Sequence, residues 1–508
     1  MNDAVGVGEN DCSRLVARNR RHGAALIELA RRWLNSVEPS KGIKLLSEAA
    51  ALRQSDAVVA LEAGTLALGL GDAALASSMR SIAESKGATP EQLAALPRDD
   101  SEGFGRADRT LRILVVTNIY PPQELGGYGR YMCDFANALR LRGHSIQVYT
   151  SDSRYLGEIP SPEPGIDRSA RLLGSWSGGG ARWIEDAVER NNIVVQSEQN
   201  CARLIEQFRP DVALVGNLDM MSLGPLRALA GAGIPMVAHI GNIHACFSMS
   251  DLLPGARVSL AASSHWLQQR LVADGFAPNQ VSVIYPAAWA RRFHMSVPPD
   301  LSLPRLAFAS LVMPYKGPHI MVQALHRLHL DGRDFRCTIA GDSIDSDFVR
   351  QLGAFLRDNR LEAKVQLAGL LKRDALLDMY ATHNLLLFPS QFEEPFGISQ
   401  VEAMAAGCLV VTSGTGGSCE AVDGGRAGIV YRRQGMSDAE QVEALAGELR
   451  SLFDDRARWA ALAAAGQKRA IAEFDIGVTL RRLELQLLAA AEGQMDISFL
   501  ADTDKPSN

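Results

Sequence analysis

The feature that most constrains the fold is an order of strand, loop, helix and strand that begins after residue 110 and starts again at Arg305. In the first unit, an apolar run over 111–117 precedes a glycine-rich turn, a helical stretch over about 130–142 and a second apolar run over 146–150. A right-handed crossover makes the two strands of such a unit parallel. The restart predicts an α/β fold with two doubly wound, Rossmann-like domains, at 110–300 and 301–475.

Composition limits the classes of protein that remain. At 508 residues the chain is too long for one hydrophobic core, since domains commonly hold about 100 to 200 residues, and three units are expected. With 22% charged residues and a formal net charge of −6, it lacks the basic excess of a nucleic-acid-binding protein, so nucleic acid is not an expected partner. Its seven cysteines are widely spread, which fits a reducing compartment and no zinc site.

Two further patterns bear on location. The N-terminus has acidic residues and no apolar run after its basic cluster, unlike a signal peptide. No segment reaches the ~18 uninterrupted apolar residues that a membrane-spanning helix needs. A cytoplasmic protein is predicted, or one peripheral at the inner face of the membrane.

Residues 1–106 differ from the rest, because they are rich in Ala, Leu and Arg and carry helical periodicity with little strand signal. They predict an N-terminal all-α domain. Segments 23–56 and 57–90 are each 34 residues long, the tetratricopeptide period, and match loosely. A tetratricopeptide-like array and a plain helical bundle both remain open, and either offers a surface for a protein partner. A polar stretch over 98–109 is a predicted linker.

The segment 388–407 carries the strongest chemical signal. A buried strand leads into a loop with Glu394, followed by a helix that is predicted to start near Ile398 and to end at Gly407. The open backbone N–H groups of Phe396, Gly397 and Ile398, with the positive end of the helix dipole, suit an anionic ligand such as a diphosphate.

Glu402 lies about one helical turn beyond Ile398, so its carboxylate can reach the same crevice as Glu394. Acidic residues in dinucleotide-binding folds accept hydrogen bonds from the vicinal hydroxyls of ribose in this way. A nucleotide attached to a polyol would satisfy both glutamates. Spacing alone is a weak signal, and the neighbouring residues make it specific.

The run Glu394-Pro-Phe-Gly-Ile-Ser-Gln-Val-Glu402-Ala-Met-Ala-Ala-Gly resembles the signature of retaining nucleotide-sugar glycosyltransferases of the GT-B fold, glycosyltransferase family 4. The resemblance covers roughly residues 110–490. It implies two Rossmann-like domains that face each other across a cleft, the first on the acceptor side and the second binding the donor. It also implies that the helix over 476–492 returns to the first α/β domain, leaving 493–508 as a tail.

Three further positions gain a role from this resemblance. The turn at Gly126 and Gly127, where glycine lets the backbone approach a phosphate or sugar closely, is similar to the first loop of the acceptor-side domain. The run ending at His239 looks like the segment whose imidazole faces the transferred sugar, although a lone histidine on an apolar strand is more often a core residue. Lys316, before Gly317 and a helix N-terminus, is placed to neutralise a departing diphosphate.

The sequence departs from the family pattern in one place that matters. Family members commonly carry an arginine a few residues before the lysine, and 308–315 contains none. The carboxylates of Asp342, Asp345 and Asp347 raise the alternative of a metal site. It is rejected because Lys316 and the helix ends already supply positive charge, so no metal and no separate cofactor are expected.

The resemblance implies glycosyl transfer from a nucleoside-diphosphate sugar to an acceptor hydroxyl, with retention. In this scheme Lys316 takes the diphosphate, Glu394 holds the sugar, Glu402 holds the ribose and His239 orients the sugar. A saccharide or a lipid-linked acceptor in bacterial surface polysaccharide or glycoconjugate synthesis is expected. The alternatives are another GT-B enzyme, such as an epimerase or phosphorylase, and a catalytically degenerate binding protein.

Overall fold

The computed structural model describes residues 57–69, 76, 79–80, 82–83, 87–93, 107–153, 163–177, 180–295, 298–431 and 433–500. The chain divides into two compact units, one made of residues 1–108 with 141–143 and the other of the remainder. In the first unit, helices α4 (Ala57–Gly69) and α6 (Pro90–Leu93) are described. The first of the two predicted 34-residue segments, 23–56, and residues 501–508 of the predicted tail lie outside the described residues.

The second unit begins with a seven-stranded sheet, which runs in the order β3-β2-β1-β6-β7-β8-β9. Each neighbouring pair is parallel. The strands are β1 (Arg112–Val116), β2 (Ser145–Ser151), β3 (Ile166–Ala170), β6 (Val212–Val215), β7 (Met236–Ile240), β8 (Val258–Ala262) and β9 (Val281–Val283). The connecting helices include α7 (Tyr128–Leu141), α8 (Ala187–Phe208), α9 (Gly224–Gly231) and α10 (His265–Ala273). A separate antiparallel hairpin joins β4 (Gly174–Ser177) to β5 (Gly180–Trp183).

A second parallel sheet has the order β12-β11-β10-β13-β14-β15. Its strands are β10 (Arg305–Ala309), β11 (Arg336–Ala340), β12 (Val365–Gly369), β13 (Leu385–Phe388), β14 (Leu409–Thr412) and β15 (Ile429–Val430). Its helices are α11 (Ala290–Phe293), α12 (Pro318–Leu330), α13 (Ser346–Asp358), α14 (Arg373–Thr382), α15 (Ile398–Ala405), α16 (Ser418–Ala421), α17 (Asp438–Asp454) and α18 (Arg456–Glu473). The predicted α/β class with parallel sheets is confirmed.

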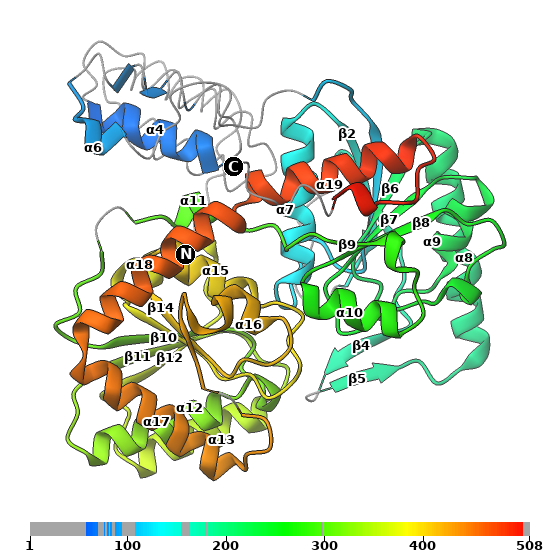
Figure 1. Ribbon diagram of the computed structural model, residues 1–508. Helices are drawn as coiled ribbons and strands as arrows, with labels where there is room; N and C mark the ends of the chain where they lie inside the picture. Colours follow the sequence, from blue (N-terminus) through cyan, green and yellow to red (C-terminus); the bar gives the residue numbers. More distant parts are fainter. Residues whose placement is uncertain are drawn as a thin grey trace, which may run out of the picture. The chain divides into compact units, whose positions relative to one another are not determined.

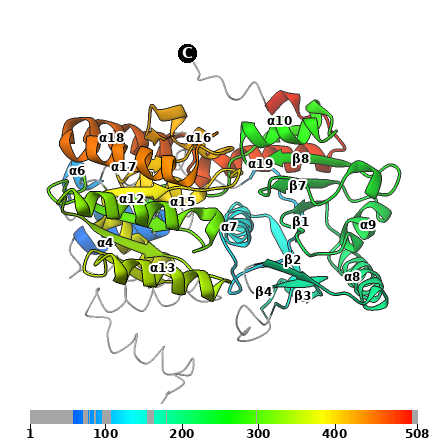
Figure 2. The ribbon, with the colours of Figure 1, turned by 90° about the horizontal axis from the view of Figure 1, so that it is seen from below.

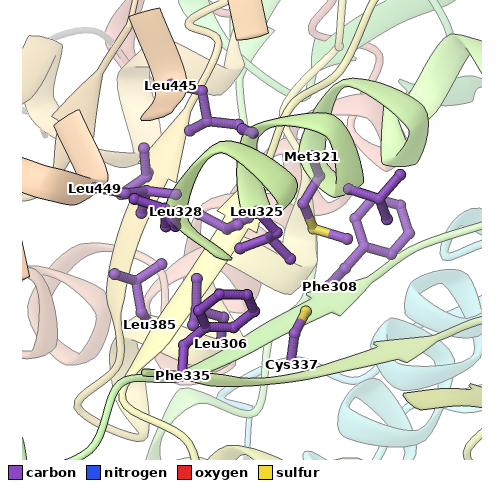
Figure 3. Packing of buried hydrophobic residues seen from close by; sticks show 14 of the residues in the cluster. Leu306, Phe308, Met321, Leu325, Leu328, Phe335, Cys337, Leu385, Leu445 and Leu449 are labelled. Atoms are coloured by element: carbon purple, nitrogen blue, oxygen red, sulfur yellow. The ribbon is translucent and has the colours of Figure 1, made fainter. Parts of the chain in front are cut away.

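Helices cover both faces of the second sheet, so its central strands are apolar throughout: every residue of β13 and β14 is buried. Figure 3 shows one face, where Met321, Leu325 and Leu328 of α12 pack onto the strands. Leu445 and Leu449 of α17 belong to the same cluster. The opposite face is closed mainly by α11, α14, α15 and α18.

The last helix, α19 (Ile476–Ala491), leaves the second sheet and packs on β6 and β7 of the first (Figure 1, red). Asp475 caps it by accepting from the Gly477 amide at 3.0 Å. Buried Gln486 then bonds Ser282 and Ser259, which fixes the helix on the first sheet. Among the described residues, no helix combines the length and the apolar character that crossing a membrane requires.

In both sheets, the strands added after the first lie on one side of it and the later strands lie on the other side. The order therefore switches between β1 and β6 in the first sheet and between β10 and β13 in the second, although all strands stay parallel. Loops that follow these strands meet at the carboxyl edge, where open α/β sheets hold their ligands. The loops after β10 and β13 carry Lys316 and Glu394, and those after β1 and β6 carry Gly127 and Asn217.

Candidate active site

Lys316 and Glu394 form a partly buried ion pair at the carboxyl edge of the second sheet. Lys316 Nζ donates to Glu394 Oε1 at 2.7 Å, and the two side chains are only 15% and 5% exposed. Ser390 Oγ donates to the same carboxylate oxygen at 2.7 Å. The ammonium also lies 4.4 Å from the ring centroid of Phe392. The structure therefore brings together two residues that the sequence placed 78 positions apart.

Local geometry explains how Lys316 is positioned. Residues Pro314–Lys316 form a single 3₁₀ turn, and Gly317 then adopts φ +73° to start α12. A Cβ at Gly317 would lie 1.9 Å from the carbonyl oxygen of Pro389, so only glycine fits there. This close approach holds the lysine loop directly against the end of β13.

The N-terminus of α15 faces the same loops and leaves its amides open. Gly397 precedes the helix with φ +95°, and a Cβ there would lie 2.8 Å from the ring of Phe388. In the part of the chain that the structure describes, the amides of Phe396, Gly397 and Ile398 donate to no protein group. Open N–H groups at the positive end of a helix dipole are an anion-binding arrangement.

A second glycine turn, which follows β14, contacts the backbone of Glu394. The amide of Gly417 donates to the Glu394 carbonyl at 2.7 Å, and a Cβ on Gly416 would lie 2.3 Å from that same oxygen. Glycine clusters alone are weak signals in a sequence. Here their role follows from the distance between the turn after β14 and the loop after β13.

Glu402 is placed differently from Glu394, because its partner comes from the first sheet. Arg130 of α7 donates to Glu402 Oε1 at 3.2 Å, whereas Glu402 Oε2 is buried and has no hydrogen-bond partner among the residues that the structure describes. Burial raises the pKa of Glu402, and Arg130 and Arg373 oppose this effect. The carboxylate therefore has one oxygen that a ligand hydroxyl would satisfy.

Besides the pair of Arg130 and Glu402, a second ion pair also includes a residue of α7. Arg373 at the start of α14 donates to Asp134 Oδ2 at 2.6 Å, with side-chain exposures of 24% and 8%. Helix α7 stands between the two sheets in both views (Figure 1 and Figure 2). Both pairs join residues more than 230 positions apart, and no sequence pattern pointed to Arg130, Asp134 or Arg373.

The glycine turn before α7 reaches the donor-side loops. A Cβ on Gly127 would lie 3.3 Å from Ile398 Cγ2, and one on Gly126 would lie 3.8 Å from Leu311 Cδ1. Gly126 has φ +71°. The turn thus lies in van der Waals range of the N-terminus of α15, which brings together the predicted donor-binding positions from both sheets.

His239 lies in the core of the first sheet. Its side chain is fully buried, with Nε2 2.9 Å from the Ile284 carbonyl oxygen and Nδ1 3.4 Å from the Tyr131 hydroxyl. Burial lowers its pKa to about 4. Both ring nitrogens have protein partners, so the predicted contact with a sugar would require the imidazole to give one of them up, and that role stays a prediction.

The expected second cation near Lys316 is absent from the sequence, and an apolar side chain, Leu311, lies toward Gly126 instead. The three aspartates after β11 have local partners. Asp345 caps α13 by accepting from the Phe348 amide at 3.0 Å, Asp342 accepts from Ser343, and Asp347 pairs with Arg350. They thus serve the loop and the start of α13.

These contacts define what the site can do. One ammonium and several open amides can hold a diphosphate, and a buried carboxylate beside them can accept hydrogen bonds from hydroxyl groups. In a buried site such charges act with little screening, which strengthens any stabilisation of a leaving anion.

Comparisons with known proteins agree with this chemistry. Residues 296–469 match the family model of glycosyl transferases group 1. The chain is 26% identical over 421 residues to glycogen synthase from Mycobacterium tuberculosis (strain CDC 1551 / Oshkosh), which covers 76% of this chain and 96% of that protein. It is 27% identical over 408 residues to D-inositol 3-phosphate glycosyltransferase 1 from Catenulispora acidiphila, covering 73% and 92%.

Among solved structures, the Anabaena protein HepE in complex with UDP and glucose superposes with a TM-score of 0.57 at 20% identity, over 75% of this chain and all of that one. That likeness shows a shared fold with parallel sheets, of the kind found in GT-B glycosyltransferases. With the matched domain and the named relatives, the findings support a glycosyltransferase enzyme.

Proposed function

We propose that this protein is a retaining glycosyltransferase that moves a sugar from a nucleoside-diphosphate sugar to an acceptor hydroxyl. One observation carries the proposal: the 2.7 Å pair of Lys316 and Glu394 lies beside the open N-terminus of α15. An ammonium and free amides fit a diphosphate leaving group, and the carboxylate fits the hydroxyls of the transferred sugar. Retention is supported by the resemblance of 394–407 to the signature of retaining enzymes.

In this proposal the diphosphate lies between Lys316 and the amides of Phe396, Gly397 and Ile398. As the bond from sugar to diphosphate breaks, negative charge grows on the departing oxygen, and these groups stabilise it. Glu394 orients the sugar, and a ribose hydroxyl donates to the unpartnered Oε2 of Glu402. A metal ion is not needed in this scheme, since the lysine and the helix end supply the positive charge.

The acceptor is proposed to bind on the first sheet, where the Gly127 turn approaches Ile398. Contact between the loops of the two sheets excludes water from the reacting bond, which disfavours hydrolysis of the donor. A role in bacterial surface polysaccharide or glycoconjugate synthesis, at the cytoplasmic side, stays a prediction from the family resemblance.

Thermal unfolding with nucleoside diphosphates and nucleotide sugars tests the donor site. A ligand at 100 times its dissociation constant should stabilise the protein by about 2.7 kcal/mol. Glu402→Gln should weaken that effect for nucleotides but not for inorganic diphosphate, which lacks ribose. No stabilisation by any nucleotide would favour the degenerate binding protein.

Product analysis then separates the remaining alternatives. Release of nucleoside diphosphate that depends on an acceptor alcohol, with the anomer of the product matching the donor by NMR, is the expected result. Release without any acceptor, or conversion of the nucleotide sugar to its epimer, would point to another enzyme of the same fold.

A further inference from the structure

A small pocket opens at the carboxyl edge of the first sheet, just past the donor-side loops. Tyr128, Asn217, Asn242 and His244 are among the residues that line it. Its volume is about 10 Å³, which is room for one water molecule or one hydroxyl group and not for a sugar ring. Any saccharide that binds here therefore rests over the pocket and inserts a single polar group.

The pocket adjoins the proposed site of transfer. Tyr128 directly follows Gly127, the residue whose Cβ position lies 3.3 Å from Ile398. The Tyr128 hydroxyl accepts from the Gly241 amide at 2.9 Å and donates to the His239 carbonyl, which fixes the ring. A ligand held against Tyr128 is thus next to the N-terminus of α15.

Amide groups dominate the polar chemistry of this edge. Asn217 Oδ1 accepts from both the Asp219 amide at 2.9 Å and Asn242 Nδ2 at 3.0 Å, which orients its side chain. In the described part of the chain, Asn217 Nδ2 has no acceptor, so it remains available to a ligand oxygen. Carboxamides recognise neutral hydroxyl groups well because they both donate and accept.

Positive charge beside the pocket is already engaged. His244 lies between Asp274 Oδ2, 2.9 Å from its Nδ1, and Arg270, which is 2.8 Å from its Nε2. The Arg270 guanidinium also stacks over the ring of Trp266. The nearby carboxylate of Asp219 would repel an anion. Among the described residues, the pocket itself therefore offers no free cation for a phosphorylated acceptor, and Arg182 of β5 falls on the hairpin face opposite Trp183, because side chains alternate along a strand.

The β4–β5 hairpin extends the same edge with aromatic surface. Its base is tied to the loop after β6, since Leu173 N donates to the Met220 carbonyl at 2.7 Å and Leu172 forms a bridge with Met221. The Trp176 side chain bonds the Asp219 carboxylate, so the hairpin lies along this loop.

Strand register places the two tryptophans of the hairpin together. Gly174 pairs with Trp183 and Trp176 pairs with Ala181, so both indoles project from one face as diagonal neighbours. Trp183 is 54% exposed, which is unusual for so large an apolar ring. An exposed indole suits the apolar face of a sugar ring, and the amides of the loop after β6, to which the hairpin is tied, suit its hydroxyl groups.

We infer that this edge, from Tyr128 and Asn217 to Trp183 on the hairpin, binds the acceptor and selects an uncharged saccharide over a phosphorylated one. The inference rests on the proposed function and adds the chemical class of the acceptor to it. Asn217 and the pocket hold a hydroxyl near the reacting centre, and the indole of Trp183 packs against a sugar face.

The test compares wild type with Trp183→Ala and with Val188→Ala, a control on α8 that removes a 69%-exposed apolar side chain from the same domain. Neutral gluco-, galacto- and manno-oligosaccharides are offered beside glucose 1-phosphate and inositol 1-phosphate. Nucleotide release and tryptophan fluorescence with bound nucleoside diphosphate are measured. Neutral saccharides should bind, and Trp183→Ala should raise their KM roughly tenfold, the loss of one aromatic contact. Val188→Ala should leave KM unchanged.

Donor and acceptor failures can be told apart. Stabilisation by nucleoside diphosphate reports the donor site alone, and Trp183→Ala should retain it. If that stabilisation is present but only phosphorylated acceptors bind, or Trp183→Ala leaves KM unchanged, or no neutral saccharide binds at all, the acceptor inference is overturned. If no nucleotide stabilises the wild-type protein, the proposed function itself fails.

Discussion

The two parallel sheets follow the same strand order, yet their carboxyl edges carry opposite chemistry. The second sheet presents a partly buried ammonium, Lys316, a carboxylate, Glu394, and the open end of a helix. The first presents carboxamides and aromatic rings around Asn217 and Tyr128. Shared topology explains where each site lies, and the loop residues decide what it binds. One edge is built for an anion and the other for neutral hydroxyl groups.

The difference between the two edges is tested most strongly by removing the positive charge of Lys316 from the second sheet. Lys316→Ala should lower kcat by roughly 10²- to 10³-fold, the loss measured for one donor to a developing anion. Steady-state nucleotide release measures it, and Lys468→Ala, an exposed lysine on α18, is the matched control. A Lys316→Ala enzyme with full activity would show that the leaving group departs elsewhere.

His239 offers a test of the first sheet's interior. Its folded pKa is about 4, below the ordinary value of 6.5, because burial disfavours the charged ring. The unfolded chain therefore binds a proton first as pH falls, and stability is lost between about pH 6.5 and 4. From neutral pH to pH 5 the loss should be about 2 kcal/mol.

Urea unfolding of wild type and His239→Gln at pH 7.5 and 5.0 measures that difference. The variant should be less stable at pH 7.5 and should lack this part of the pH dependence. Its kcat at pH 7.5 adds a second readout. A large fall in kcat with little change in the pH dependence would favour the predicted contact with the sugar over a core role.

The pairs that join the sheets give a smaller effect. In a double-mutant cycle with Asp134→Asn and Arg373→Gln, the coupling energy in unfolding should be about 1 to 2 kcal/mol, reduced from that of a fully buried pair because Arg373 is 24% exposed. The pair of Asp347 and Arg350, 68% and 71% exposed, should give a coupling near zero in the same assay. Equal coupling energies for the two pairs would mean that the pair of Asp134 and Arg373 gains no stability from its place between the two sheets.

Much of this arrangement is readable from sequence because it is local. The strand 385–388, Glu394 and the helix that follows fix the donor edge within about twenty residues, and parallel topology then brings the Lys316 loop alongside. For His239, the sequence does not indicate whether the side chain faces the core or the ligand-binding edge. All five residues of β7 are buried, so no alternation of polar and apolar positions tells which side chains face the edge.

The contacts of α7 were unreadable for a different reason. Arg130 and Asp134 lie on one face of a helix, at positions four apart, as many solvated residues do. Their partners Glu402 and Arg373 become neighbours only when the two domains come together. Such pairs depend on the relative placement of two separately folded sheets, and a single sequence holds no pattern for it.

The smallest expected effect concerns Glu420, a residue of the second domain whose carboxylate contacts the first domain. Its Oε2 accepts from the His265 amide at 2.9 Å and its Oε1 from the Trp266 amide at 2.7 Å, so it caps α10 of the first domain. Ser264 already caps this helix at the Leu267 amide, which limits what Glu420 adds. Glu420→Ala should lower the free energy of unfolding by about 1 kcal/mol.

Glu473→Ala is the control, because it removes an exposed carboxylate that pairs with Arg469, and it should lower the free energy of unfolding by less. A larger loss for Glu473→Ala than for Glu420→Ala would indicate that the contact between the domains is not maintained in solution.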